Sequence, residues 1–277
     1  MRLQSFLSQS GVASRRSVID ELEAGKVKVN GEIVRIPSYP IFPGKDEVTY
    51  EDKPVRISQS KLYFIFNKPR GVITTAKDTH GRKTVLDYFK EVKERLYPVG
   101  RLDQDTTGLL LLTNDGDLAH KLMHPRFGML KVYEALLDKE ILKEQISQLE
   151  GGGVEVEGKP TSECKIKVLN VRDGKSRVEV YLHEGRKRQI RVMFESIGIR
   201  VMHLHQKRYG ALNLKGLAPG KYRPLTESEI KILQSGVKHE QRKESVGIQN
   251  RNEPTHAPAA REHRGHGVRR RNPFHRG

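Results

Sequence analysis

Hydrophobic positions near the start of the chain recur at the spacing of two short helices. Residues 3–7 place three apolar side chains on one helical face. Residues 15–23 repeat this pattern, and Ser14 is the predicted N-cap of the second helix because its hydroxyl can accept a hydrogen bond from an early backbone N–H. The apolar positions are Leu3, Phe6 and Leu7 in the first helix, and Val18, Ile19 and Leu22 in the second.

Strand-like alternation follows directly. The stretch VKVNGEIV (residues 27–34) alternates apolar and polar positions around Asn30-Gly31, a residue pair favoured in tight two-residue hairpin turns. Residues 1–50 are therefore predicted to form a small module of two helices and a hairpin. Residues 51–60, EDKPVRISQS, are polar with one proline and are predicted to be a linker.

Residues 61–237 contain more strand-like or apolar runs than helix candidates. The mixture does not alternate regularly, so it predicts an α+β domain around a mixed, largely antiparallel sheet with flanking helices. The apolar runs are LYFIFNKP (62–69), GLLLLTND (108–115), KVYEALLD (131–138), CKIKVLNV (164–171), RVEVYLH (177–183) and QIRVMFESIG (189–198). The helix candidates are TVLDYFKEVKERL (84–96), GDLAHKLMHP (116–125), KEILKEQISQLE (139–150) and TESEIKILQSG (226–236).

One of these runs begins next to an unusual carboxylate. Four leucines, residues 109–112, predict a buried strand, and the polar stretch GRLDQDTTG precedes them. A carboxylate beside such a strand, as at Asp103, is solvated, paired or reactive, because an unpartnered buried charge is costly. Asp105 and the two threonines after it are predicted to shape the loop through local backbone bonds.

The last 40 residues, 238–277, contain almost no large apolar side chains and are predicted to be disordered, since they cannot bury enough surface to offset the entropy of ordering. They carry 10 Lys+Arg against 4 Asp+Glu, including three consecutive arginines at 269–271. Two interpretations stay open: a solubilising extension, and an arm that binds RNA phosphates without sequence preference.

The whole chain carries a formal charge of +17 with a pI near 9.9, which predicts a polyanionic partner. Nucleic acid is the first candidate and an anionic membrane surface the second. No apolar stretch approaches the roughly 20 residues that span a bilayer, and the N-terminus lacks the apolar core of a signal peptide. We therefore expect a cytoplasmic protein with no membrane association. The single cysteine, Cys164, is expected to be a small buried hydrophobe.

Motifs for several chemistries are missing. The sequence contains neither a phosphate-binding GxxxxGK[ST] loop, nor GxGxxG after a strand, nor a G-x-S-x-G nucleophile. Two histidine pairs, at 120 and 124 and at 203 and 205, lack an obvious third metal ligand, so surface or RNA-facing histidines are the better interpretation. Use of a nucleotide cofactor and a histidine metal site therefore have no support in the sequence. Carboxylate, arginine and tyrosine chemistry remains.

The N-terminal segment GVASRRSVIDELEAGKVKVNG resembles the small αL RNA-binding module first known from a ribosomal small-subunit protein. The net charge of residues 1–60 is only +1, so RNA affinity there depends on arrangement. Four basic side chains are expected to lie on one surface around the second helix and the hairpin. They are Arg15, Arg16, Lys26 and Lys28.

Four motifs, in order, resemble those of the RsuA/RluB-type bacterial rRNA pseudouridine synthases, which also place an αL module before the synthase domain. They are NKPRG (67–71), GRLDQDTTGLLLLTNDG (100–116), KVYEA (131–135) and EGRKRQIRVMFESIG (184–198). The resemblance extends from residue 2 to about residue 235. It implies an enzyme that detaches a uracil from C1′ of its ribose, rotates it and reattaches it through C5, without metal or cofactor.

The resemblance also assigns roles to residues. It implies that Asp103 is the catalytic aspartate, that Tyr133 packs on the flipped base, and that Arg191 pairs with Asp103. A carboxylate beside the sugar would stabilise or capture the positive charge that develops when the glycosidic bond breaks. Arg101 and Lys68 are expected to bind phosphate or to support the loop.

Alternatives remain for residues and function. Tyr133 in ordinary core packing, Arg191 as a surface RNA contact and Asp103 as a loop-shaping carboxylate are the simpler interpretations. The expected partner is ribosomal RNA or a ribosome assembly intermediate. The protein itself is expected to be a monomer. The tail and the stretch GGGVEVEGKP favour the large-subunit (23S) branch over a 16S target. The rival functions are a noncatalytic rRNA-binding or assembly factor on the same fold, and a protein that binds DNA or nonspecific polyanions.

Deletion of residues 238–277 tests the RNA-binding interpretation of the tail. We expect weaker RNA binding, most pronounced at low salt, and a shallower dependence of log affinity on log salt, because fewer counterions are released. Fluorescence anisotropy with an rRNA fragment at several salt concentrations measures both. An unchanged affinity and slope would identify a solubilising extension.

Overall fold

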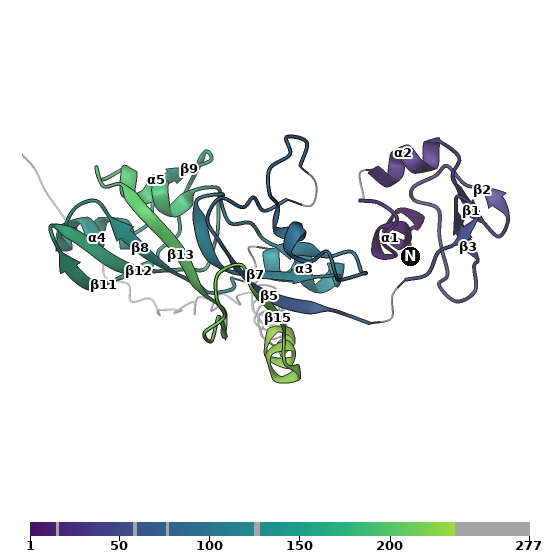
Figure 1. Cartoon of the computed structure of the whole chain (residues 1–277). Helices are drawn as coiled ribbons and strands as arrows, with labels where there is room; N and C mark the ends of the chain where they lie inside the picture. The colour runs from purple at the N-terminus through teal and green to yellow at the C-terminus, as the bar shows by residue number, and fades with distance from the viewer. Residues whose placement is uncertain (15–16, 58–59, 76–77, 125–127, 236–277) are drawn as a thin grey trace, which may run out of the picture. The chain divides into compact units, whose positions relative to one another are not determined.

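The computed structural model (Figure 1) describes residues 1–14, 17–57, 60–75, 78–124 and 128–235. The predicted tail at 238–277 lies outside these residues, as do Arg15 and Arg16. Within the described residues no helix combines the length and apolar composition needed to cross a bilayer.

The N-terminal module has the predicted helices and hairpin. Its core contains the three apolar side chains of the first helix, Val18 and Leu22 of the second and the inward side of the strands, whereas Ile19, predicted on the same face, is 37% exposed. Asn30 and Gly31 both have positive φ, 51° and 87°, as the tight turn between β1 and β2 requires. Ser14 Oγ accepts a hydrogen bond from the Ser17 N–H at 3.1 Å, which confirms the predicted cap. The elements are α1 (Leu3–Gln9), α2 (Ser17–Glu23), β1 (Val27–Val29), β2 (Glu32–Ile33), β3 (Val48–Tyr50) and β4 (Lys53–Pro54), with sheet order β2-β1-β3-β4.

The module extends further than the sequence predicts. Strand β4 pairs with β3, and the Val55 N–H donates to the Val48 carbonyl at 2.8 Å. Val55 and Ile57 pack against the module's core. A linker beginning at residue 51 is therefore wrong, because two apolar side chains in this polar stretch find partners that only the folded sheet provides.

A nine-stranded sheet organises residues 63–224. Its main path runs β11-β12-β8-β13-β7-β5-β15, with β14 beside β13 and β6 beside β7. All pairings are antiparallel except that of β7 with β13, so the predicted α+β class is confirmed. The strands are β5 (Tyr63–Lys68), β6 (Tyr97–Val99), β7 (Thr106–Thr113), β8 (Lys131–Leu137), β11 (Lys165–Arg172), β12 (Lys175–Leu182), β13 (Val201–Tyr209), β14 (Leu212–Asn213) and β15 (Tyr222–Pro224). A separate hairpin joins β9 (Glu155–Val156) to β10 (Lys159–Pro160).

The leucine run lies inside β7 and faces both sides of the sheet. Leu109 and Leu111 belong to one core, together with α3 (Gly116–Met123), whereas Leu110 and Leu112 belong to another. Each is at most 3% exposed. Burying a leucine contributes about 1.5–3 kcal/mol, so β7 is strongly anchored along its length.

Three helices match their predicted positions, and two segments differ. Helix α3, α4 (Lys143–Glu150) and a helix over residues 227–235 lie within their predicted ranges. The apolar run 189–198 contains helix α5 (Gln189–Glu195) rather than a strand. The predicted helix 84–96 is only the 3-10 turn η1 (Val85–Tyr88), which Thr84 and Asp87 close by capping each other's backbone.

Gly108 permits the single parallel contact of the sheet. Its φ is +107°, and a Cβ there would lie 2.3 Å from the Gln206 carbonyl oxygen of β13. A Cβ at that distance would push the backbones of β7 and β13 apart. Glycine at 108 therefore lets β7 and β13 approach directly after the polar loop that carries Asp103.

Gly108→Ala is expected to lower the free energy of unfolding by more than about 1 kcal/mol, because the added methyl group strains the backbone and separates β7 from β13. Urea denaturation measures the change. Gly151→Ala is the matched control, since Gly151 has an ordinary helical φ of −67° and a Cβ there has its nearest contact at 3.6 Å. Equal stabilities for the two variants would contradict this role of Gly108.

Candidate active site

A buried lysine fixes the loop that carries Asp103. Lys68, at the end of β5, is 0% exposed. Its ammonium donates hydrogen bonds to the carbonyl oxygens of Asp103 at 3.0 Å and Thr106 at 2.7 Å. Longer bonds reach the carbonyls of Pro69 at 3.2 Å and Gln104 at 3.4 Å. Of the two roles expected for Lys68, phosphate binding and support of the loop, the structure therefore favours support of the loop.

Burial lowers the pKa of Lys68 to about 8, against the opposing effect of the negative charges of Asp105 and Asp103. The side chain is still largely protonated at pH 7. A protonated amine has three N–H donors and no acceptor, which suits a cluster of converging carbonyl oxygens.

Further main-chain bonds hold the same loop. The Thr74 hydroxyl donates to the Leu102 carbonyl at 2.7 Å. The Gly71 N–H donates to the Gln104 carbonyl at 2.8 Å, and the Gln104 amide returns a bond to the Gly71 carbonyl at 3.2 Å. Leu102 is buried in the core beside β7. The loop is thus fastened by main-chain carbonyls, by the Gln104 side chain and by the apolar side chain of Leu102.

The Asp103 carboxylate is left available. Its residue is half-buried, and among the described residues no hydrogen bond or ion pair engages the carboxylate. Asp103 lines a cavity of about 740 Å³ together with Arg101 and Tyr133. The site therefore presents a carboxylate that is held in place and faces a space large enough for a nucleotide.

Arg191 pairs with Asp105, not with Asp103 as predicted. Its Nη2 lies 2.7 Å from Asp105 Oδ2, and its Nη1 donates to the Val201 carbonyl at 2.7 Å. The chain turns at residues 104 and 105, which separates the directions of the two carboxylates. Burial lowers the pKa of Arg191, and Asp105 opposes this shift. Asp105, expected only to shape the loop, thus joins it to α5 through an ion pair.

Tyr133 lines the same cavity as Asp103, and its stacking on a flipped base stays a prediction. Its ring packs against two cores, and the residue also lines the cavity. Burial raises the pKa of Tyr133, with smaller contributions from Tyr209 and from the negative charge of Asp103. The phenol is therefore protonated at neutral pH. Packing against cores and facing the cavity coexist here, so the two interpretations of Tyr133 are not exclusive.

Basic side chains surround the cavity. They come from the loop that carries Asp103, from the loop before α5, from the hairpin β9–β10 and from β8, and three acids, Asp103, Glu157 and Glu184, line the same cavity. Those lining the cavity are Arg101, Lys131, Lys159, Arg186, Lys187 and Arg188. Such a rim suits a phosphate backbone. The sequence did not single out Lys131 or Arg186, although both lie inside the quoted motifs.

Arg186 attaches the hairpin β9–β10 to this rim. Its guanidinium donates to the carbonyls of Lys159 at 2.7 Å and Pro160 at 2.8 Å, and forms an ion pair with Glu184 at 3.0 Å. The stretch GGGVEVEGKP is therefore positioned at the cavity by a residue from the α5 motif.

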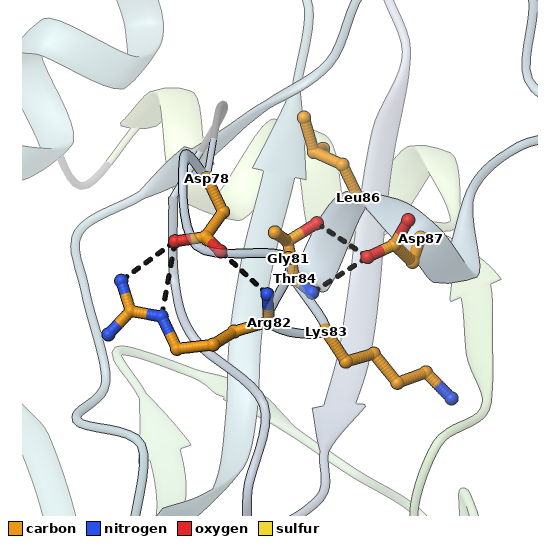
Figure 2. Close-up of a pocket in the computed structure, with 7 residues that line it drawn as sticks. All are labelled: Asp78, Gly81, Arg82, Lys83, Thr84, Leu86 and Asp87. Carbon is orange, nitrogen blue, oxygen red and sulfur yellow. Dashed lines mark hydrogen bonds and ion pairs between the residues drawn. The ribbon is translucent and has the colours of Figure 1, made fainter.

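A second hollow, of about 490 Å³, lies along residues 78–87 (Figure 2). Its carboxylates serve the local backbone. Asp78 pairs with Arg82 at 2.7 Å and accepts the Arg82 N–H, whereas Asp87 accepts the Thr84 N–H (Figure 2). These two carboxylates are engaged in local bonds that shape the segment, so the cavity that Asp103 lines is the better candidate for the active site.

The remaining predicted residues have ordinary surroundings. Lys26 forms ion pairs with Glu21 and Glu51, and Lys28 pairs with Asp52 at 2.6 Å. Their RNA contacts stay predictions. Within the part of the chain that the structure describes, no three metal-binding side chains cluster. Cys164 is half-buried and donates to the Leu149 carbonyl.

Comparison with known proteins gives concordant matches. Residues 62–196 match the family described as RNA pseudouridylate synthase, and residues 1–47 match the S4 domain. The chain is 44% identical to ribosomal large subunit pseudouridine synthase B of Bacillus subtilis, over 86% of this chain and 97% of that protein. It is 37% identical to an uncharacterized RNA pseudouridine synthase of Aquifex aeolicus, over 86% and 95%. A crystal structure of a pseudouridylate synthase superposes with a TM-score of 0.62 and 32% identity, covering 84% of this chain and 99% of that one.

Asp105→Asn is expected to leave the Arg191 charge without a partner. Since Asp105 is 37% exposed, we expect a loss of about 1–2 kcal/mol in the free energy of unfolding, below that of a fully buried pair. Urea denaturation measures it. Asp173→Asn is the control, because the Arg172–Asp173 pair is 89% and 85% exposed and should contribute nothing measurable. Similar values for both variants would mean that the Arg191–Asp105 pair does not support the loop.

Proposed function

Since the chain belongs to the RNA pseudouridylate synthase family, with an S4 domain before the synthase domain, we propose that it converts a specific uridine of large-subunit (23S) ribosomal RNA to pseudouridine, with Asp103 as the catalytic carboxylate. The observation that carries the proposal is the Asp103 carboxylate itself. It is fixed by its backbone, lacks a partner among the described residues, and faces a basic-rimmed cavity.

The cavity suits a nucleotide that has left its helix. A uridine in folded RNA must flip out before its glycosidic bond can be reached, at a cost of a few kcal/mol. Stacking on an aromatic ring contributes about 1–3 kcal/mol per base, and Tyr133 offers such a ring. The rim arginines and lysines would hold the flanking phosphates.

Asp103 would act on C1′ of the ribose. Breakage of the C1′–N1 bond develops positive charge on the sugar, and a carboxylate stabilises this charge or bonds to the carbon. The free uracil then turns, and C5 forms the new bond to C1′. Lys68 and the Arg191–Asp105 pair would act indirectly, by keeping the loop in place.

Similarity to a relative named for the large subunit supports the large-subunit target. The Bacillus subtilis relative is named for the large ribosomal subunit. The hairpin β9–β10, formed by GGGVEVEGKP, lines the cavity in this chain. A monomer in the cytoplasm, acting on rRNA or on an assembly intermediate, remains the accompanying prediction. Mapping pseudouridines in rRNA from a deletion strain identifies the nucleotide and separates 23S from 16S.

Asp103→Asn is expected to lower the rate of pseudouridine formation by about a thousandfold or more while RNA affinity stays within about threefold, because the charge is lost but the shape is kept. Tritium release from C5-labelled rRNA measures turnover, and anisotropy measures binding. Turnover like that of the wild type would refute the role of Asp103. Absence of tritium release from the wild type itself would favour the noncatalytic binding factor.

A further inference from the structure

Lys131 shares the cavity with Asp103 and Tyr133. It begins β8, two residues before Tyr133, and side chains two apart on a strand point to the same face, about 7 Å from each other. Both residues line the cavity. A uracil stacked on the Tyr133 ring would therefore lie within reach of the long Lys131 side chain.

The ammonium of Lys131 is only weakly engaged. Its bond to the Met129 carbonyl is long, 3.4 Å, and it lies 5.7 Å from the centroid of the Tyr209 ring. Among the described residues no carboxylate lies within 4 Å of it. The nearby Glu184 is already occupied by Arg186 at 3.0 Å and by Gln189 at 2.6 Å.

The surroundings of Lys131 are partly desolvated. Burial lowers the pKa of Lys131, and Glu184 opposes the shift. Its stem packs against Gly185, where an added Cβ would lie 3.6 Å from Lys131 Cε. A half-buried cation with unused donors, directed by its strand into a cavity, is suited to an anion that enters the cavity.

The reaction produces such an anion. When the C1′–N1 bond breaks, its electron pair remains on N1 and spreads over O2 and O4 of the uracil. Formation of the C5–C1′ bond uses electrons of this ring, after which C5 loses its proton and N1 gains one. The negative charge on the detached base is thus obligatory, and Asp103, itself negative, cannot stabilise it. Arg191 is committed to Asp105 and to the Val201 carbonyl.

We propose that Lys131 is a catalytic residue whose ammonium donates a hydrogen bond to a carbonyl oxygen of the detached uracil and stabilises its negative charge. This inference rests on the proposed function of the same cavity. Lys131 thereby complements Asp103: the carboxylate serves the positive sugar, and the ammonium serves the negative base.

Lys131→Met tests this role through the leaving group. With uridine in the target RNA, we expect the single-turnover rate constant to fall about 100- to 1,000-fold with little change in RNA affinity. A 5-fluorouridine at the same position leaves more easily, because fluorine withdraws electrons from the ring. The deficit of the variant should then shrink by about tenfold or more, measured as loss of the original nucleoside by mass spectrometry of digested RNA.

Two further variants separate charge from structure. Lys131→Arg keeps the cation and should retain more activity than Lys131→Met. Its ratio of rates with 5-fluorouridine and with uridine should resemble that of the wild type. Lys159→Met removes a cationic rim residue; it should weaken RNA binding and leave the fluorine dependence unchanged. Circular dichroism and thermal melting verify folding, and Lys131→Gln replaces Lys131→Met if the latter does not fold.

The outcomes are distinct. Equal deficits of the Lys131 variant on both substrates would overturn the inference and assign Lys131 a structural role. A Lys131→Met enzyme as active as the wild type would overturn it too. If the wild type converts neither uridine nor 5-fluorouridine in rRNA, it is the proposed function that fails, and the two failures are therefore distinguishable.

Discussion

The contact of the buried Lys68 ammonium with four main-chain carbonyls underlies the rest of the site. A loop rich in polar residues would ordinarily be held by side-chain bonds, and these would engage its carboxylates. Here Lys68 binds the main-chain carbonyls of Pro69, Asp103, Gln104 and Thr106 and leaves the Asp103 carboxylate unengaged. The burial cost, visible in the lowered pKa of Lys68, is offset by charge-assisted hydrogen bonds. The result is a fixed loop whose Asp103 carboxylate stays free.

Two carboxylates in the same loop therefore serve different purposes. Asp105 is paired with Arg191 and joins the loop to α5, whereas Asp103 faces the cavity. The leucines of β7 anchor the strand that follows, and Gly108 lets it lie against β13. The same set of contacts therefore keeps β7 rigid and leaves the Asp103 carboxylate facing the cavity. Electrostatic catalysis requires such preorganisation, since groups that must reorient in the transition state lose much of their effect.

The sequence predicts those features that depend on local pattern. The leucine run, the Asn30-Gly31 turn and helix α3 follow from periodicity and turn chemistry, and the motif singles out Asp103, which lies in the cavity lining. Features that depend on tertiary contacts escape it. The apolar run at 189–198 reads equally as strand or helix, because α5 is buried on most sides. Val55 and Ile57 look like linker residues until a sheet exists for them to cover.

The site's ion pairs were harder still to predict. Arg191 has two candidate carboxylates two residues apart, and only the turn at 104–105 decides between them. A lysine is normally exposed, so the burial of Lys68 cannot be inferred without the carbonyls that converge on it. Arg186 likewise finds its acceptors in a hairpin 26 and 27 residues earlier in the chain.

The central claim is that a loop held by its backbone presents a free Asp103 carboxylate to a flipped uridine. A crystal structure of the Asp103→Asn variant with unmodified target RNA tests it most directly. We predict the target base stacked on Tyr133, its C1′ within about 3.5 Å of the side chain at position 103, and Lys68 still bound to the loop carbonyls. A target uridine bound outside this cavity, or a ribose turned away from position 103, would contradict the account.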